Sequence, residues 1–177
     1  IGLDATAPGA EQTGIDFHPG DAKRLLILGD DAAAPAVCSI LEQLPTHAAE
    51  VEAVVEVPQL ARKIEAGPDG HWTDSRGNRI NIRWQERLSE RGDRLAEAIE
   101  DHLHRFPLPR CQQDSPEEGP DDLLWDTPAS PPQEFYSWIA GESTMVRRLR
   151  RILVNDHGVD RRHIAFMGYW RHGSAGM

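Results

Sequence analysis

The sequence is poor in cysteine and aromatic residues and has no long apolar run. Its two cysteines, Cys38 and Cys111, match no metal-ligand spacing and no disulfide framework, so we expect a reducing compartment, the cytoplasm. No stretch approaches the roughly 20 apolar residues that cross a bilayer, and no membrane span is expected. Lys and Arg number 19 against 29 Asp and Glu, a net charge of -10, which argues against nucleic acid as a partner.

Several sequence motifs that indicate cofactor binding, metal binding or catalysis are also missing. The turn after the first apolar run has Gly29 but no further glycine, so a Gly-rich dinucleotide fingerprint is absent. The eight histidines form no zinc-type set, and His102 and His104 are expected on a solvated helix end. No serine elbow or cysteine nucleophile is present, so we predict no catalytic side chain and no metal site.

What the chain of 177 residues does contain is an alternation of short apolar runs with segments of helical spacing. We expect strands at 24–28, 52–57, 80–84, 135–140 and 163–169, helices between most of them, and a polar turn at 68–78. This pattern predicts an α/β fold: a three-layer parallel sheet of about five strands with helices on both faces. The predicted domain spans 21–173, with an extended lead-in at 1–20 and an acidic, Pro-rich loop at 107–134.

Ligands of such sheets bind at the carboxyl ends of the strands, so the turns at Gly29, Gly141 and Gly168 are the candidate site. The first turn runs from Asp30 to Pro35 into a helix whose N-terminus could receive a phosphate; the alternative is a plain βα turn. At the second turn Gly141 would allow close approach of a ligand, and Glu142 could accept from a ribose or amide or simply cap a helix.

Two further groups of side chains have open interpretations. Arg83 and Arg87 flank Trp84 at the end of the third strand, and an arginine there could pair with a 2′-phosphate or be merely solvated. At the end of the last strand, Tyr169, Trp170 and Arg171 suit a flat ligand or a partner surface, or pack within the domain.

Several segments in order resemble the C-terminal half of siderophore-interacting proteins, over about Phe17 to Gly173. These are flavin-dependent ferric-siderophore reductases of the ferredoxin-NADP reductase superfamily. The similar segments are Gly29-Asp30 through Pro35-Ala36, Ile40 to Pro45, Glu56-Val57, Trp138 to Glu142, the arginine-rich helix that follows, and Gly168 to Gly173.

The resemblance implies a ferredoxin-NADP-reductase-like nucleotide domain that presents NAD(P)H to FAD, for reduction of Fe(III) in a ferric siderophore and release of Fe(II). It also implies roles by position. Asp30, Ala32, Ala33 and Pro35 would contact the pyrophosphate, Arg87 the adenosine end, Gly141 and Glu142 the nicotinamide side, and Tyr169, Trp170 and Arg171 the flavin edge or the siderophore approach.

The twenty or so residues ahead of the first strand are too few for the β-barrel that holds FAD in this family. We therefore expect FAD to come from another domain of the parent protein or from a partner in trans, and the chain alone to be catalytically silent. One alternative is a non-catalytic, stand-alone binding module that uses the same fold for a siderophore or a protein partner. Another is a structural fragment that self-associates through surfaces the barrel would cover.

Overall fold

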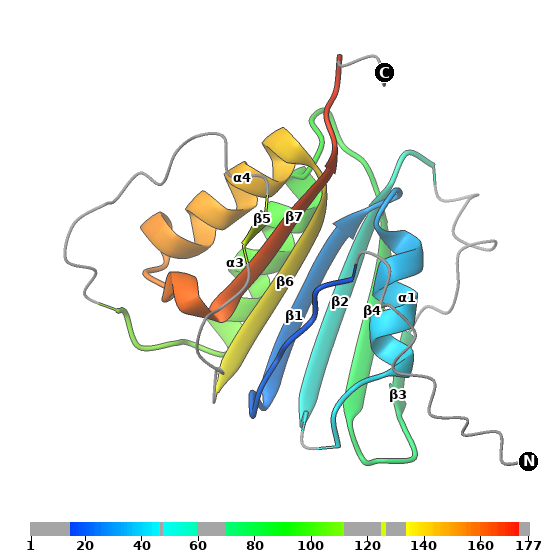
Figure 1. Cartoon of the computed structure of the whole chain (residues 1–177), viewed down its shortest axis with the longest axis vertical. Helices are drawn as coiled ribbons and strands as arrows, with labels where there is room; N and C mark the ends of the chain where they lie inside the picture. The colour runs from blue at the N-terminus through cyan, green and yellow to red at the C-terminus, as the bar shows by residue number, and fades with distance from the viewer. Residues whose placement is uncertain (1–14, 47, 60–69, 112–124, 127–133, 174–177) are drawn as a thin grey trace, which may run out of the picture.

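The fold is built on one mixed sheet, shown in Figure 1. The computed structural model describes residues 15–46, 48–59, 70–111, 125–126 and 134–173. Within them, seven strands lie in the order β3-β4-β2-β1-β6-β7-β5. Neighbours among β4, β2, β1, β6 and β7 pair in parallel, whereas β3 and β5 are antiparallel at the two edges. The strands are β1 Arg24–Asp30, β2 Glu50–Val57, β3 Gly70–Thr73, β4 Arg79–Glu86, β5 Trp125–Asp126, β6 Phe135–Glu142 and β7 Ile164–Trp170.

The five strands expected from the sequence are the five parallel ones, so that prediction is confirmed. Central strands are buried on both faces, which explains their continuous apolar runs: all eight residues of β6 are buried. The edge strands were missed. Strand β3 lies inside the predicted turn region 68–78. None of its four residues is buried, so they gain their order from pairing with β4 and leave no apolar run in the sequence. Strand β5 lies inside the predicted loop 107–134, most of which falls outside the described residues.

Helices cover both faces of the sheet, as predicted (Figure 1). Helix α1, Ala34–Glu42, packs on the face that receives Leu25 and Ile27 of β1. Helices α3, Asp93–Arg105, and α4, Ser143–Arg151, pack on the opposite face with Leu26 and Leu28. Successive β1 residues therefore enter two separate cores, which gives the three layers. No helix in the described part of the chain is long and apolar enough to cross a bilayer.

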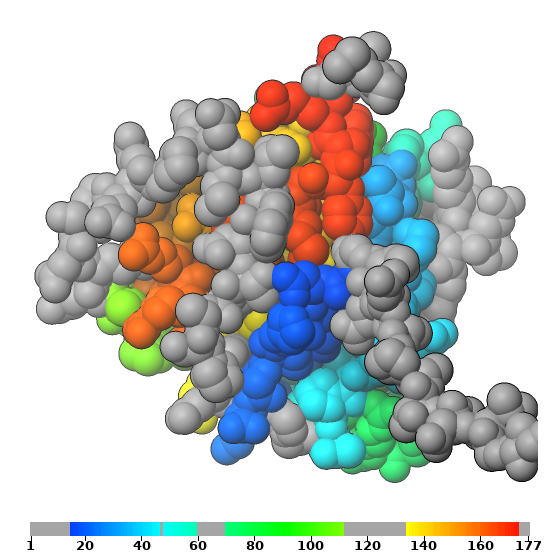
Figure 2. Space-filling view, viewed as in Figure 1, coloured from blue at the N-terminus to red at the C-terminus, as the bar shows by residue number. Residues whose placement is uncertain are grey.

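The end of the predicted lead-in is extended, but it packs against the sheet instead of running free. Phe17 meets the ring of Tyr136 edge-on at 5.5 Å between centroids, and Trp138 Nε1 donates to the carbonyl of Asp16 at 3.1 Å. Figure 2 shows this segment, in dark blue, lying on the sheet face between α1 and the C-terminal strand. It covers apolar area on that face, which explains why it is ordered. Residues 1–14 lie outside the described part, and the proposed boundary at 20 stays a prediction.

The order of the strands places a topological switch between β1 and β6. From β1 the chain moves outward through β2 to β4, then returns to the other side of β1 for β6 and β7. The two connections leave β1 and β6 in opposite directions, so a crevice is expected at the carboxyl ends of these strands. This is the edge on which the candidate residues were predicted.

Candidate functional site

The buried carboxylate of Asp30 joins three strand ends. Its side chain is fully buried at the end of β1. Oδ1 accepts from the backbone N–H groups of Ala32 and Ala33 at 3.0 and 3.2 Å. Oδ2 accepts from the backbone N–H of Glu142 at 2.9 Å and from Trp170 Nε1 at 3.1 Å. The turn after β1, the end of β6 and the end of β7 thus meet at one side chain.

Gly141 makes room for this carboxylate. Its φ of +143° is a conformation that L side chains rarely adopt, and a Cβ built there would lie 2.5 Å from Asp30 Cγ. The space that a glycine opens at this turn is therefore filled by Asp30. Whether Gly141 also lies against a nicotinamide ring stays a prediction.

The environment of Asp30 has an effect on its protonation. Burial raises the pKa of the Asp30 carboxyl above its usual value, against the opposing effect of the hydrogen bonds from Glu142 and Trp170. Arg91 Nη1, at 3.6 Å from Oδ2, is a cation beside it. The carboxylate is thus satisfied mostly by neutral N–H donors.

Two arginines lie on the same edge of the sheet. The guanidinium of Arg91 lies over the ring of Trp170, 4.5 Å from its centroid, and its Nη1 is 3.4 Å from Asp31 Oδ1. Arg87 Nη2 is 3.1 Å from the same oxygen of Asp31. With side chains only 24% and 18% exposed, both guanidinium groups are fixed in position at the switch point.

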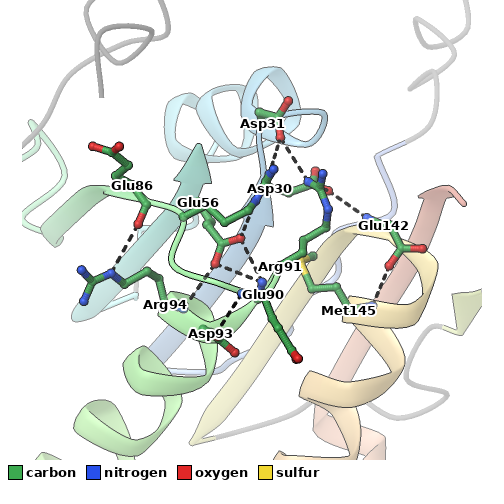
Figure 3. A network of polar contacts seen from close by, with 12 residues as sticks. Asp30, Asp31, Glu56, Glu86, Glu90, Arg91, Asp93, Arg94, Glu142 and Met145 are labelled. Atoms are coloured by element: carbon green, nitrogen blue, oxygen red, sulfur yellow. Dashed lines mark hydrogen bonds and ion pairs between the residues drawn. The ribbon is translucent and has the colours of Figure 1, made fainter. Parts of the chain in front are cut away.

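Glu56 is the second-last residue of β2, near the position where dinucleotide-binding folds place an acid against a ribose hydroxyl. Here its fully buried carboxylate accepts from the backbone N–H of Gly92 at 2.9 and 3.0 Å and from that of Arg94 at 3.2 Å. Arg87 Nε donates to it as well, at 3.1 Å. Figure 3 shows Glu56 directed at the start of α3, so this acid caps a helix instead of facing outward.

Glu142 caps a helix, which was the alternative interpretation of this residue in the sequence. Its Oε2 accepts from the backbone N–H of Met145 at 2.9 Å, which caps α4 (Figure 3). Its Oε1 accepts from the backbone N–H of His172 at 3.3 Å. Burial acts to raise the pKa of this carboxyl, but the backbone hydrogen bonds outweigh it and the pKa is lowered. Ser143 Oγ donates to the carbonyl of Trp170 at 2.9 Å and ties the two turns together.

The structure brings most of the predicted residues to one place. Those that meet around the Asp30 carboxylate are Asp30, Ala32, Ala33, Gly141, Glu142 and Trp170. Arg87 reaches them through Asp31, and Pro35 lies in the first turn of α1. Tyr169, 39% exposed, and Arg171 lie on the surface beside Trp170.

Sequence reasoning missed Asp31, Glu56, Arg91 and Ser143 as members of this network. Glu56 carried a signal, because a charged residue that directly follows the apolar run Ala53 to Val55 in a buried strand needs a buried partner. The expectation for His102 was wrong: it is 1% exposed and bonded to Glu52, since the helical spacing of α3 turns it toward the sheet. Among the described residues, no group of three or more His, Cys, Asp and Glu could hold a metal ion.

Comparison with known proteins gives a consistent result. The family model described as siderophore-interacting protein matches residues 22–173. The solved siderophore-interacting protein SipS from Aeromonas hydrophila is 22% identical with a TM-score of 0.54, over 89% of this chain and 54% of that one. The siderophore-interacting protein from Acinetobacter baumannii is 18% identical with a TM-score of 0.56, over 90% and 51%.

A siderophore utilization protein from T. fusca is 23% identical with a TM-score of 0.55, over 91% of this chain and 49% of that one. No curated protein sequence matches. At these identities the solved structures show a shared fold. The chain spans about half the length of each of these structures.

Proposed function

The chain belongs to the siderophore-interacting protein family, and on this premise we propose that it is the NAD(P)H-binding domain of a ferric-siderophore reductase. In this proposal it delivers hydride to FAD on another domain of the parent protein or on a partner protein. Fe(III) in a ferric siderophore would then be reduced and Fe(II) released for iron acquisition, in the cytoplasm. The length of the similar structures, about twice that of the matched region, supports a division of the activity between two domains.

One observation supports the proposal most strongly: three turns converge on Asp30 at the switch point between β1 and β6. Open α/β sheets bind their ligands at this position. Asp30 fixes the turn after β1 to the Gly141-Glu142 turn and to the ring of Trp170, so the surface is pre-organised before a ligand arrives.

The residues present fit a nucleotide, with one change from the expectation. The N–H groups of Ala32 and Ala33 donate to Asp30, so they are already engaged by a carboxylate of the chain itself. Positive charge for a phosphate comes instead from Arg87 and Arg91, which share one oxygen of Asp31. We therefore propose the two guanidinium groups as the phosphate contacts.

Bound NAD(P)H supplies the hydride; the residues of this chain bind and orient it. We propose that the nicotinamide side lies near Gly141 and Glu142 and that Trp170, fixed by Asp30 and Arg91, is a flat apolar surface at the end of β7. Exposed Tyr169 and Arg171 would face the flavin domain or the siderophore.

Isothermal titration of the chain with NADPH and, separately, NADH tests the proposal. We expect saturable binding of at least one nucleotide, weakened about tenfold or more by Arg87→Ala or Arg91→Ala, because a charge-assisted hydrogen bond contributes roughly 1.5–3 kcal/mol. Arg162→Ala is the matched control, since Arg162 pairs with Asp160 in an exposed contact away from the site.

Binding that neither arginine substitution changes would contradict the assigned phosphate contacts. If the folded chain binds neither nucleotide but does bind a ferric siderophore, the nucleotide-domain proposal fails and the non-catalytic binding module replaces it. Circular dichroism on each variant establishes that the chain is folded before titration.

A further inference from the structure

A second hollow lies at the other end of the sheet. A pocket of about 330 Å³ is lined by the amino-terminal halves of β2 and β4, by β3 and by the C-terminal turn of α3. That size is at the lower end of the range for small-molecule sites. Asp30 and Glu142 end β1 and β6 at the opposite edge, where Glu56 also lies near the end of β2, so this pocket is separate from the proposed nucleotide site.

The floor of the pocket is a buried ionic cluster centred on Glu52, which is 5% exposed. Its Oε2 lies 2.7 Å from His102 Nδ1 and 2.7 Å from Arg105 Nη2, and its Oε1 lies 2.5 Å from Arg83 Nη2. Burial would raise the pKa of the Glu52 carboxyl, but the hydrogen bond from His102 and the charges of Arg83 and Arg105 outweigh it and lower the pKa. Glu52 is therefore a firmly ionised anchor for three basic groups.

Two polar atoms of the lining are buried without a hydrogen-bond partner: His102 Nε2 and Asn81 Oδ1. The His102 ring is 1% exposed, and its Nδ1 is engaged by Glu52, so its tautomer leaves Nε2 as an acceptor when the ring is neutral. Buried polar atoms in folded proteins are normally bonded. Both atoms are closed to solvent in this structure, so a ligand hydroxyl would satisfy either acceptor once the lining side chains shift to admit it.

The charge around the pocket selects the sign of the ligand. Three guanidinium groups lie in or beside it, those of Arg79, Arg83 and Arg105, against the two carboxylates of Glu50 and Glu52. One positive charge is left over. A monocarboxylate neutralises it, whereas a zwitterionic amino acid leaves it uncompensated and a phosphate dianion exceeds it.

Apolar side chains complete the lining. Phe106 and Trp72, each half-buried, lie on the wall of the pocket with Ile80. The ring of Phe106 is tilted against that of His102, with centroids 5.3 Å apart, so an apolar surface adjoins the imidazole ring. The pocket therefore offers a cationic group, a hydroxyl acceptor and an apolar wall within one small volume.

We propose that this pocket binds a small α-hydroxy monocarboxylic acid with an apolar side chain. The carboxylate is bound by the guanidinium groups of Arg79 and Arg105, the hydroxyl by His102 Nε2 or Asn81 Oδ1, and the apolar side chain lies along Phe106. Arg105 has N–H groups to spare, because its contacts with Asp101 and Glu52 engage two of the five. The site does not depend on the nucleotide proposal, since it uses none of the same residues.

The test is titration of the ¹⁵N-labelled chain with 3-phenyllactate, followed by NMR. We expect saturable shifts at amides of the lining residues and none at the turn of Asp30. Two probes separate the parts of the ligand: 3-phenylpropionate, which lacks the hydroxyl, and phenyllactamide, which lacks the charge. The first should bind about fivefold or more weakly and the second not measurably.

Arg79→Gln tests the site from the protein side. Arg79 is 69% exposed and its substitution should not unfold the chain, yet it should weaken phenyllactate binding about fivefold or more. Arg76→Gln, which changes the charge outside the lining, is the control and should leave binding unchanged. The proposal is overturned if phenyllactate causes no shifts at the pocket, if the acid and amide bind equally, or if inorganic phosphate binds there and phenyllactate does not.

Discussion

The two ends of the sheet each contain a buried acid, and the two acids are stabilised differently. At the carboxyl end, Asp30 accepts four hydrogen bonds from neutral N–H groups, three of them in the backbone. At the amino end, Glu52 is bonded to His102 and two arginine side chains. Both are nearly inaccessible to solvent, yet the pKa of Asp30 is raised and that of Glu52 is lowered.

The difference teaches that burial and hydrogen bonding are not enough to keep a carboxyl acidic. Backbone N–H groups satisfy the oxygen atoms of Asp30, but partial charges do not recover the full cost of removing the anion from water. The two guanidinium groups beside Glu52 do, because they add full charges at hydrogen-bond distance, 2.5 and 2.7 Å, whereas the cation beside Asp30, Arg91, is 3.6 Å away. The Asp30 end is therefore held by its backbone geometry and the Glu52 end by its charges, and the following variants test this distinction.

The largest effect is expected from Gly141→Ala. The added Cβ would meet the Asp30 carboxylate at 2.5 Å, and the φ of +143° is itself unfavourable for alanine. Strain and overpacking together should lower the free energy of unfolding by about 4 kcal/mol or prevent folding. Gly70→Ala is the control: it has a φ of +129° but nothing within 4 Å, so only backbone strain of about 1 kcal/mol is expected. Urea unfolding measures both, and equal losses would contradict the role given to the Asp30 contact.

Glu52→Gln should have the next largest effect. It leaves His102 and two guanidinium groups without their anion, which costs about 3 kcal/mol once the partial exposure of the arginines is considered. Glu50→Gln removes a similar carboxylate from an exposed pair with Arg79 and should cost less than about 0.5 kcal/mol. Thermal and urea unfolding compare the two, and a small loss for Glu52→Gln would show that the cluster is not held by charge.

Asp30→Asn comes third. The amide keeps one acceptor oxygen but directs an NH₂ group at two of the four donors, which leaves buried N–H groups unpaired at about 2 kcal/mol in total. Asp31→Asn is the matched control, because the Asp31 carboxylate is 37% exposed and its side-chain partners are the guanidinium groups of Arg87 and Arg91, not backbone N–H groups. The indole fluorescence of Trp170 should also shift in Asp30→Asn alone, since its Nε1 loses its acceptor; an unchanged spectrum and stability would contradict the network.

The sequence alone predicts the framework of the sheet but not the contrast between the surroundings of Asp30 and Glu52. The alternation of apolar runs and helical spacings predicts the five parallel strands and both helical layers, because burial on two faces imposes a composition that is visible locally. The three turns that the sequence singled out, at the ends of β1, β6 and β7, do lie together around Asp30, whereas their role as a binding site stays a prediction. The partners of Asp30 were not predictable, since Glu142 and Trp170 are 112 and 140 positions away along the chain.

His102 is a second residue whose burial and partner could not be predicted from the sequence. A His-Leu-His run in a charged helix is typical of a solvated face, and only the position of α3 over β2 turns His102 onto Glu52. The acids Glu50, Glu52 and Glu56 recur at even spacing in β2, which places them on one face. Which of them meets a cation and which meets a helix N-terminus depends on the packing of α3, and no local pattern contains that information.

The smallest effect, and the most direct test of the comparison, is the pH dependence of stability. Glu52 has a folded pKa below its ordinary 4.5, so its contribution is fully present above that pH and is lost as the pH falls through the folded value. Asp30 has a folded pKa above its ordinary 3.8, so the native state binds its proton more tightly, and stability falls as the pH rises through the folded value.

The difference in unfolding free energy between wild type and Glu52→Gln should therefore grow from about pH 3 to pH 7, while that between wild type and Asp30→Asn should shrink. Taking the difference between wild type and variant at each pH cancels the contributions of the other titrating groups, because both proteins contain them. If both differences change in the same direction, neutral donors and charged partners act alike on buried acids here, and the distinction between the two ends of the sheet is wrong.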